Sequence, residues 1–191
     1  MMMTEYISTI FKDLQLTAEE KELTEQLFTE VTYKKGEVIL HTNEKVLYQY
    51  YVLKGCIRTY FMDSKGKEHT IQFAIQDWWI SDYIGYFSES ESVLTIECIT
   101  EATVLKVAKK ELDNIYEKVP KIEHFFRKKL ERSTVRFQKR ILNNLALSAK
   151  ERYQLFLQTY PNIEQQIKNY HLASYLGITT ESLSRIRKET C

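Results

Sequence analysis

The sequence predicts an α+β protein: an N-terminal antiparallel, jelly-roll-like β-roll flanked by helices, then a long helix and a C-terminal all-α helix-turn-helix domain. Apolar and polar residues alternate in several short runs of the first half, as in half-buried strands. Glycine is absent between Gly85 and Gly177, which favours long helices in the second half. Charge also divides the chain, because residues 1–120 carry 13 Lys and Arg against 20 Asp and Glu, whereas residues 121–191 carry 14 against 6.

The composition excludes several classes of protein. The 191 residues are 43% hydrophobic and 28% charged, the balance of a soluble globular chain, and 5 Gly with 2 Pro exclude a collagen-like one. Cys56, Cys98 and Cys191 are too few and too far apart for a disulfide scaffold, so we expect a reducing compartment. The start lacks a basic region followed by an apolar run, and no stretch reaches the ~18 apolar residues of a membrane span. We therefore expect a cytoplasmic protein with no membrane partner.

Four runs predict the strands of the roll. Alternating residues mark three of them, and a Tyr-rich run that ends at Gly55 marks the fourth. The runs are Val46 to Leu53, Ile57-Thr59-Phe61, Ile71-Phe73-Ile75 and Leu94-Ile96-Cys98. Residues 63–67 (DSKGK) have the composition of a turn and join the second and third runs as a hairpin.

Helices are predicted on both sides of the strands. Residues 17–20 (TAEE) fit a capping box, and we expect the helix that follows to run to about Glu30. A second helix is predicted from Lys110 to Val119, after which Pro120 suits the first turn of another. Residues 148–151 (SAKE) form a second capping box and start a helix that Pro161 ends.

The helix predicted from Lys121 to Leu147 has one apolar seam. Its members recur every three or four residues: Ile122, Phe126, Leu130, Ser133, Phe137, Ile141 and Leu145. A helix of ~40 Å cannot bury such a seam in a small domain alone. We expect a parallel partner helix and hence a homodimer, although packing along the chain's own roll is the alternative. The expected domains are 1–120 for the roll, 121–147 for the dimerisation helix and 148–191 for DNA binding.

The last stretch has helix-turn-helix spacing. Leu172, Ala173 and Leu176 form an inward face, Gly177 suits the turn, and a second helix starts near Thr179 or Thr180. Its exposed side carries Thr180, Glu181, Ser184, Arg185 and Lys188. Arg can form a fork of hydrogen bonds to guanine and Glu can accept from cytosine, so these residue types favour double-stranded DNA as the partner. A purely structural helix pair is the alternative, and the net charge of +8 in this half argues against it.

The order of these parts resembles the Crp/Fnr family of bacterial transcription regulators over nearly the whole chain. The matching segments are residues 35–37 (KGE), 52–55 (VLKG), 172–177 (LASYLG) and 181–185 (ESLSR). The resemblance implies a homodimer joined through the long helix, with Glu181 and Arg185 as base readers and Thr179 and Ser182 toward phosphates. It also implies an unknown small-molecule effector and makes RNA polymerase a candidate partner.

The sequence departs from the family at the cyclic-nucleotide site. Cyclic-nucleotide-binding relatives hold the ribose with a Gly-Glu pair and the cyclic phosphate with an Arg-Ser pair eleven residues later. The aligned positions here are Ser81-Asp82 and Ser92-Val93, and no Lys or Arg occurs between Glu68 and Glu101. A buried phosphate would lack its charge-assisted partner, so we expect no high-affinity binding of cyclic AMP or cyclic GMP. Asp82 either keeps a contact to a polar effector in this pocket or is a strand-end residue.

A second departure concerns the wing, a β-hairpin that follows the recognition helix in many relatives. Only three residues follow Lys188, so we expect no wing and expect the helices to make the phosphate contacts. If the helix-turn-helix is vestigial, the chain is instead a ligand-binding or protein-interaction protein.

Other chemistries find no support in the sequence. The four His residues are scattered and no N-terminal Cys cluster is present, so we expect no metal site and no cofactor. No phosphate-cradling Gly loop or nucleophile motif occurs, and we expect no enzyme. One aromatic group either lines an effector pocket or belongs to the core or an interface: Trp78, Trp79, Tyr83, Tyr86 and Phe87.

Overall fold

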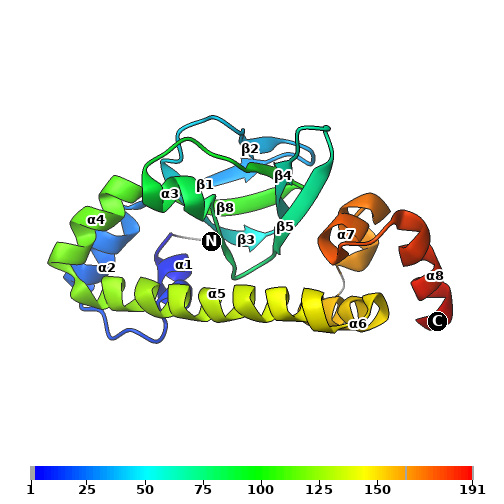
Figure 1. Ribbon diagram of the computed structural model, residues 1–191. Coiled ribbons are helices and arrows are strands. Elements are labelled where there is room, and N and C mark those ends of the chain that lie inside the picture. The colour runs from blue at the N-terminus through cyan, green and yellow to red at the C-terminus, as the bar shows by residue number, and fades with distance from the viewer. Residues whose placement is uncertain (1–2, 162, 191) are drawn as a thin grey trace.

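Two antiparallel sheets form a roll that lies above one long helix (Figure 1). The computed structural model describes residues 3–161 and 163–190. The helices are α1 (Met3–Ile10), α2 (Ala18–Glu25), α3 (Tyr83–Ser88), α4 (Lys109–Lys118), α5 (Pro120–Ala146), α6 (Ala149–Thr159), the short 3-10 helix η1 (Glu164–Gln166), α7 (Asn169–Leu176) and α8 (Thr180–Thr190). The strands are β1 (Phe28–Tyr33), β2 (Val38–Leu40), β3 (Tyr48–Lys54), β4 (Ile57–Met62), β5 (Glu68–Ala74), β6 (Trp79–Ile80), β7 (Thr95–Cys98) and β8 (Ala102–Ala108).

The sheets have the strand orders β1-β8-β3-β6 and β2-β7-β4-β5, and every pair of neighbours is antiparallel. Side chains from both sheets fill the space between them with a common apolar cluster that includes Val52, Ile57, Ile80, Ile96 and Val104. The predicted fold class, a β-roll with flanking helices and a helical C-terminal part, is confirmed. None of the helices in the described part of the chain is long and apolar enough to cross a membrane.

The predicted hairpin is present as β4 and β5. The Asp63 carboxylate accepts hydrogen bonds from the backbone N–H groups of Lys65 (2.9 Å) and Lys67 (3.0 Å), which fixes the turn between the strands. The alternation prediction fails at two positions, because Arg58 is buried while Phe61 is 42% exposed. The C-terminal helices cover the outer face of this hairpin over part of its length, so side chains on that face are buried there. Phe73 of β5 is an example, since it packs against Phe156 of α6.

The helix predicted up to about Glu30 is wrong at its C-terminal end. Thr17 and Glu20 do form the capping box, but α2 stops at Glu25. Residues 28–33 instead form β1, which pairs with β8 along its whole length and buries Phe28. The β-branched residues of this segment fit a strand, and the hydrogen bonds to β8 outweigh the helical periodicity.

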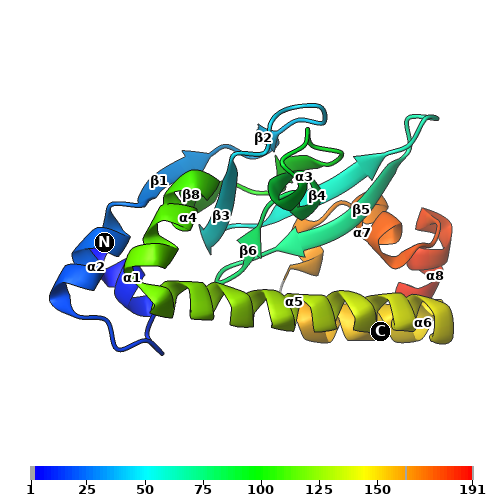
Figure 2. The ribbon, with the colours of Figure 1, turned by 60° about the vertical axis from the view of Figure 1, so that its left-hand side comes forward.

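The long helix α5 runs beneath the roll from the α1, α2 and α4 end to the C-terminal helices (Figure 2). It starts with Pro120 in its first turn, as predicted, and has 27 residues, or about 40 Å. Only the start of the helix is buried, where Ile122, Phe125 and Phe126 join an apolar cluster with α1 and α4. At its other end, Ser148 and Glu151 form the predicted second capping box and begin α6.

Gly55 provides a direct test of this fold. Its φ is +95°, and a Cβ there would lie 2.3 Å from the Glu101 carbonyl oxygen. Gly66, in the hairpin turn, has a φ of +75° and open space around it. We expect Gly55→Ala to lower the free energy of unfolding by about 3 kcal/mol or more, and Gly66→Ala by about 1 to 2 kcal/mol, because only the first adds a steric clash to backbone strain. Urea unfolding of both variants measures the difference, and equal losses would contradict the close approach of residues 55 and 101.

Candidate functional site

The helix-turn-helix is formed by α7 and α8. Gly177 ends α7 in the left-handed region at φ +67°, and the N–H of Ile178 donates to the carbonyl of Ala173 at 3.0 Å. Thr179 then begins α8, since its Oγ1 accepts the backbone N–H of Ser182 at 3.2 Å. The predicted turn and helix start are therefore confirmed, and Thr179 has a structural role as a helix cap.

One face of α8 is available to a partner. Leu183 and Ile186 are buried against the other C-terminal helices. Six of the predicted contact residues lie on the remaining faces: Thr180 and Ser182 are partly exposed, and Glu181, Ser184, Arg185 and Lys188 are exposed. Arg185 Nη2 lies 3.4 Å from Ser182 Oγ. Hydrogen bonds from its own backbone N–H and from the hydroxyls of Thr179 and Thr180 hold the pKa of Glu181 below its usual range, so this acceptor is ionised at neutral pH.

Arg187, which the sequence analysis did not single out, positions α8. Its Nε donates to Glu164 Oε1 at 2.6 Å and its Nη1 to Asn169 Oδ1 at 2.5 Å. Tyr153 also donates to the Glu164 carboxylate. This network joins α8 to α6, η1 and the start of α7, so the exposed face of α8 is held in a fixed direction.

The structure brings Asp82, Ser92 and Val93 together at the positions aligned with the cyclic-nucleotide site, with Asp82 and Ser92 buried and Val93 exposed. Asp82 is fully buried and caps α3, and its Oδ1 accepts the N–H groups of Ile84 (2.9 Å) and Gly85 (3.4 Å). Its Oδ2 accepts Ser92 Oγ at 2.8 Å and the Val93 N–H at 2.9 Å. The carboxylate thus uses the donors that an incoming anion would require.

Ser81 lies beside this cluster without joining it. It is buried, and its Oγ donates to the backbone carbonyl of Tyr48 at 2.8 Å. The four predicted effector-pocket residues therefore lie close together, but each polar side chain among them has an internal partner. Their role toward an effector stays a prediction.

Comparison with known proteins supports the resemblance. Residues 30–119 match the model of the cyclic nucleotide-binding domain. Among curated proteins, none has a sequence that matches this chain. CLP of Xanthomonas campestris, a c-di-GMP-responsive global regulator, is similar in structure with a TM-score of 0.72 at 13% identity over 91% of each chain. The chain has the Crp/Fnr fold.

Two further solved structures share the Crp/Fnr fold with this chain. FixK2 of Bradyrhizobium japonicum has a TM-score of 0.70 at 22% identity, over 85% of this chain and 83% of its own. A transcriptional regulator of Eubacterium rectale assigned to the Crp/Fnr family has a TM-score of 0.69 at 18% identity, over 94% and 85%. The likeness therefore extends from the roll through the long helix to the C-terminal helices.

The C-terminal helices of this Crp/Fnr fold dock on β5, the edge strand of the second sheet. Ser174 Oγ, on α7, accepts the Thr70 N–H and donates to the Glu68 carbonyl, both at 2.8 Å. From α5, the Arg140 guanidinium donates to the carbonyls of Thr70 (3.2 Å) and Ile71. These bonds satisfy the free edge of β5, which would otherwise expose unpaired backbone groups.

Apolar side chains complete this contact. Phe73 from β5 lies against Phe156 of α6 and Tyr175 of α7, with ring centroids 6.1 Å and 5.3 Å away. Cys56 and Ile99 from the roll join the same cluster as Leu172 and Leu183 of the helix-turn-helix. The roll and the helical part thus share one core.

A buried ionic group lies under this contact. The Arg58 guanidinium is 1% exposed, and it pairs with Glu68 at 2.7 Å and Glu97 at 2.6 Å. His171 of α7 is also buried, and its Nδ1 lies 3.9 Å from the Glu68 carboxylate without a hydrogen-bond partner. Burial, reinforced by the charges of Arg58 and Lys168, lowers the pKa of His171 from 6.5 to about 3. The docked arrangement therefore requires a neutral imidazole.

The predicted seam of α5 divides between two environments. Ile122 and Phe126 are buried in the protomer's own core. Leu130 and Phe137 are each 37% exposed and, with the half-buried Ser133, line the cleft between α5 and the roll, whereas Ile141 is 60% exposed and does not line it. Leu130, Phe137, Ile141 and Leu145 form a stripe at helical spacing from the middle of the helix to its C-terminal end. The part of the seam open to a partner is therefore this stripe, and dimerisation stays a prediction.

His171 makes the stability of the protein depend on pH. A His whose pKa is lower in the folded than in the unfolded state stabilises the fold fully above the unfolded pKa of 6.5 and progressively less as pH falls toward 3. We expect the free energy of unfolding to drop by up to about 2 kcal/mol from this group between pH 7 and pH 5. His171→Gln removes the titration while keeping a polar side chain of similar reach. Denaturant unfolding at several pH values should show a steeper acid loss for the wild type, whereas identical pH profiles would contradict the buried neutral state of His171.

Proposed function

We propose that the protein is a sequence-specific DNA-binding transcription regulator of Crp/Fnr type. The observation that carries the proposal is the exposed face of α8, where Glu181, Ser184, Arg185 and Lys188 stand on a rigid helix that follows a Gly turn. Short polar and Arg side chains at the N-terminal part of a recognition helix are the groups that read base edges in the major groove. The net charge of +8 over residues 121–191 supports attraction to phosphates.

The dimeric form follows from α5 under this proposal. The apolar stripe of Leu130, Phe137, Ile141 and Leu145 is exposed in the protomer, and a parallel partner helix would bury it. A two-fold axis along α5 would present two α8 helices to successive major grooves, about 34 Å apart. RNA polymerase is a further candidate partner, and the expected location is the cytoplasm, with no catalytic activity.

The proposed regulator does not respond to cyclic AMP. Asp82 places a carboxylate on the N-terminal N–H groups of α3 and on Ser92 and Val93. No Lys or Arg side chain makes an ion pair with Asp82 among the residues described. A cyclic phosphate would have to displace the Asp82 carboxylate from its buried hydrogen-bond donors. No cation would then pair with the phosphate, so its burial is unfavourable.

Selection from a library of random 30-base-pair duplexes tests these points together. We expect the wild type to enrich an inverted repeat with half-sites about one helical turn apart, and Arg185→Ala to lose about 1 to 3 kcal/mol on that sequence and relax one base position. Arg127→Ala is the control, since Arg127 is exposed on α5 and paired with Glu131 far from α8. Cyclic AMP should leave the affinity unchanged.

Three results would count against this function. Enrichment of no sequence at low salt would remove the DNA-binding proposal, and enrichment of a single half-site would remove the dimer. Equal affinities of the Arg185→Ala variant and the wild type would remove Arg185 as a base reader.

A further inference from the structure

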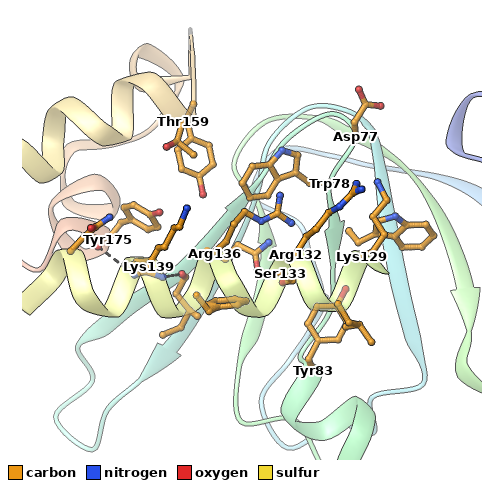
Figure 3. A pocket seen from close by; sticks show the side chains of 18 of the residues that line it. Asp77, Trp78, Tyr83, Lys129, Arg132, Ser133, Arg136, Lys139, Thr159 and Tyr175 are labelled. Carbon is orange, nitrogen blue, oxygen red and sulfur yellow. Dashed lines mark hydrogen bonds between the residues drawn. The ribbon is translucent and has the colours of Figure 1, made fainter. Parts of the chain in front are cut away.

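A cleft of about 410 Å³ lies between α5, the β6 end of the roll and the C-terminal helices. Its lining comes from residues 126–144 of α5 on one side, Leu130 and Phe137 of the apolar stripe among them, and from the roll, α6 and α7 on the other, including Trp78, Tyr160 and Tyr175. Figure 3 shows this space from close by. Asp82 and Ser92 do not line it, although Tyr83 and Tyr86 of α3, the helix that Asp82 caps, do. The volume lies in the range of small-molecule sites, about 300 to 1,000 Å³.

Four cations line the cleft on one side of α5. Lys129, Arg132, Arg136 and Lys139 rise from the helix in the same direction, toward Trp78 (Figure 3). They span about 15 Å of the helix axis, at 1.5 Å per residue. None of the four makes an ion pair with an acidic side chain in the described part of the chain.

The neighbouring cations of α5 differ in having partners. Arg127 and Lys128 both pair with Glu131, at 2.5 Å and 2.9 Å. Arg140 and Arg152, which also line the cleft, donate to backbone carbonyls: Arg140 to those of Thr70 in β5 and Tyr175 in α7, and Arg152 to those of Leu147 and Leu176. Among the described residues of α5, the four cations of the cleft wall thus have neither an acidic partner nor a carbonyl acceptor, whereas Arg140 has carbonyl acceptors.

These cations also repel one another. Burial and the charges of Arg132 and Arg136 lower the pKa of Lys129. The Asp77 carboxylate, which also lines the cleft, accepts the Tyr51 hydroxyl at 2.7 Å and offsets this repulsion only weakly. A ligand with more than one negative charge would relieve the repulsion along the wall.

Aromatic rings form the opposite side. The rings of Trp78 and Tyr160 have centroids 5.4 Å apart, and the Arg136 guanidinium lies 5.0 Å from the centroid of the Trp78 ring. Tyr175 lies beyond them, with its ring centroid 5.9 Å from that of Tyr160. Flat π-faces beside guanidinium groups favour a ligand that combines a planar ring with anionic groups.

We propose that this cleft binds a nucleotide that carries two or more phosphate charges, with the phosphates on Lys129, Arg132, Arg136 and Lys139 and a base against the Trp78 side. The inference rests on the proposed function in making such a ligand the effector. The cleft borders the roll, the long helix and the docked helices at once, so its occupancy changes the balance between docked and released helix-turn-helix units.

Tryptophan fluorescence tests the site directly, because Trp78 and Trp79 are the chain's 2 Trp residues and both line the cleft. The full-length protein is titrated with ATP, GTP and cyclic di-AMP, and separately with pyrophosphate and with adenosine. We expect saturable quenching by at least one of the three nucleotides. Pyrophosphate, which lacks a ring, and adenosine, which lacks charge, should have an affinity at least about tenfold lower than that of the nucleotide.

Matched variants locate the binding. Arg132→Ala and Arg136→Ala should each weaken nucleotide binding about tenfold or more, since each removes a charge-assisted contact. Lys128→Ala removes a cation from the same helix, but one that pairs with Glu131 outside the cleft, and it should bind as the wild type does. Circular dichroism melts of the variants show that each is folded at the temperature of the titration.

The proposal is overturned if no nucleotide quenches, if the three variants bind equally, or if pyrophosphate binds as tightly as the nucleotides. It is also overturned if random duplex DNA displaces the nucleotide, which would assign the charges to the DNA backbone. Duplex selection on the same preparation separates this result from the proposed function. A chain that selects DNA but binds no nucleotide loses only this inference, and one that binds nucleotide but selects no DNA loses the regulatory role.

Discussion

The free edge of β5 is the constraint on which the arrangement of the molecule depends. An edge strand leaves N–H and C=O groups that must be paired or solvated. Here Ser174 of α7 and Arg140 of α5 supply the partners, through the backbone of residues 68–71. The same side chains therefore satisfy the sheet and hold the helix-turn-helix against the roll. Loss of these hydrogen bonds would expose the backbone edge of β5 and release the helix-turn-helix from the roll.

The docking of the C-terminal helices on β5 connects the ionisation of His171 and the contents of the cleft to the position of the helix-turn-helix. His171 enters the docked surface only as a neutral imidazole, over the buried Arg58 ion pairs. The cleft between Trp78 and the cations of α5 ends at the same helices. The face of α8 that carries Arg185 stays exposed in the docked state, so docking sets the position of the proposed DNA-reading face without covering it. In the proposed function, regulation is then a change in the position of the helix-turn-helix relative to the roll.

Local signals in the sequence were sufficient for the parts of the fold that depend on neighbours along the chain. The capping boxes at Thr17 and Ser148, the turn at Asp63 and the turn at Gly177 all occur where short-range hydrogen bonds or a positive φ require those residue types. The helix predicted beyond Glu25 is absent because residues 28–33 pair with β8, about 70 to 80 residues away along the chain. Helical periodicity cannot report such a partner.

The candidate sites show the same division. The exposed face of α8 could be predicted because it follows from the spacing of Leu183 and Ile186. The structure brings Asp82 beside Ser92 and Val93, and its four internal hydrogen-bond donors could not be predicted from the alignment alone. The hydrogen bonds of Ser174 and Arg140 to β5 could not be predicted from the sequence. Their partners are backbone groups, which occur at every position and so give no sequence pattern.

Hydrogen exchange at the Thr70 amide is the most direct measure of the docked arrangement. This N–H has Ser174 Oγ as its acceptor at 2.8 Å, although it lies on an edge strand. In the docked arrangement the Thr70 amide should exchange slowly in the full-length wild type, and Ser174→Ala should speed its exchange while leaving core amides such as that of Val104 protected. Fast exchange of the Thr70 amide in the wild type, at the rate of an open strand edge, would contradict the docking of the helix-turn-helix on the roll.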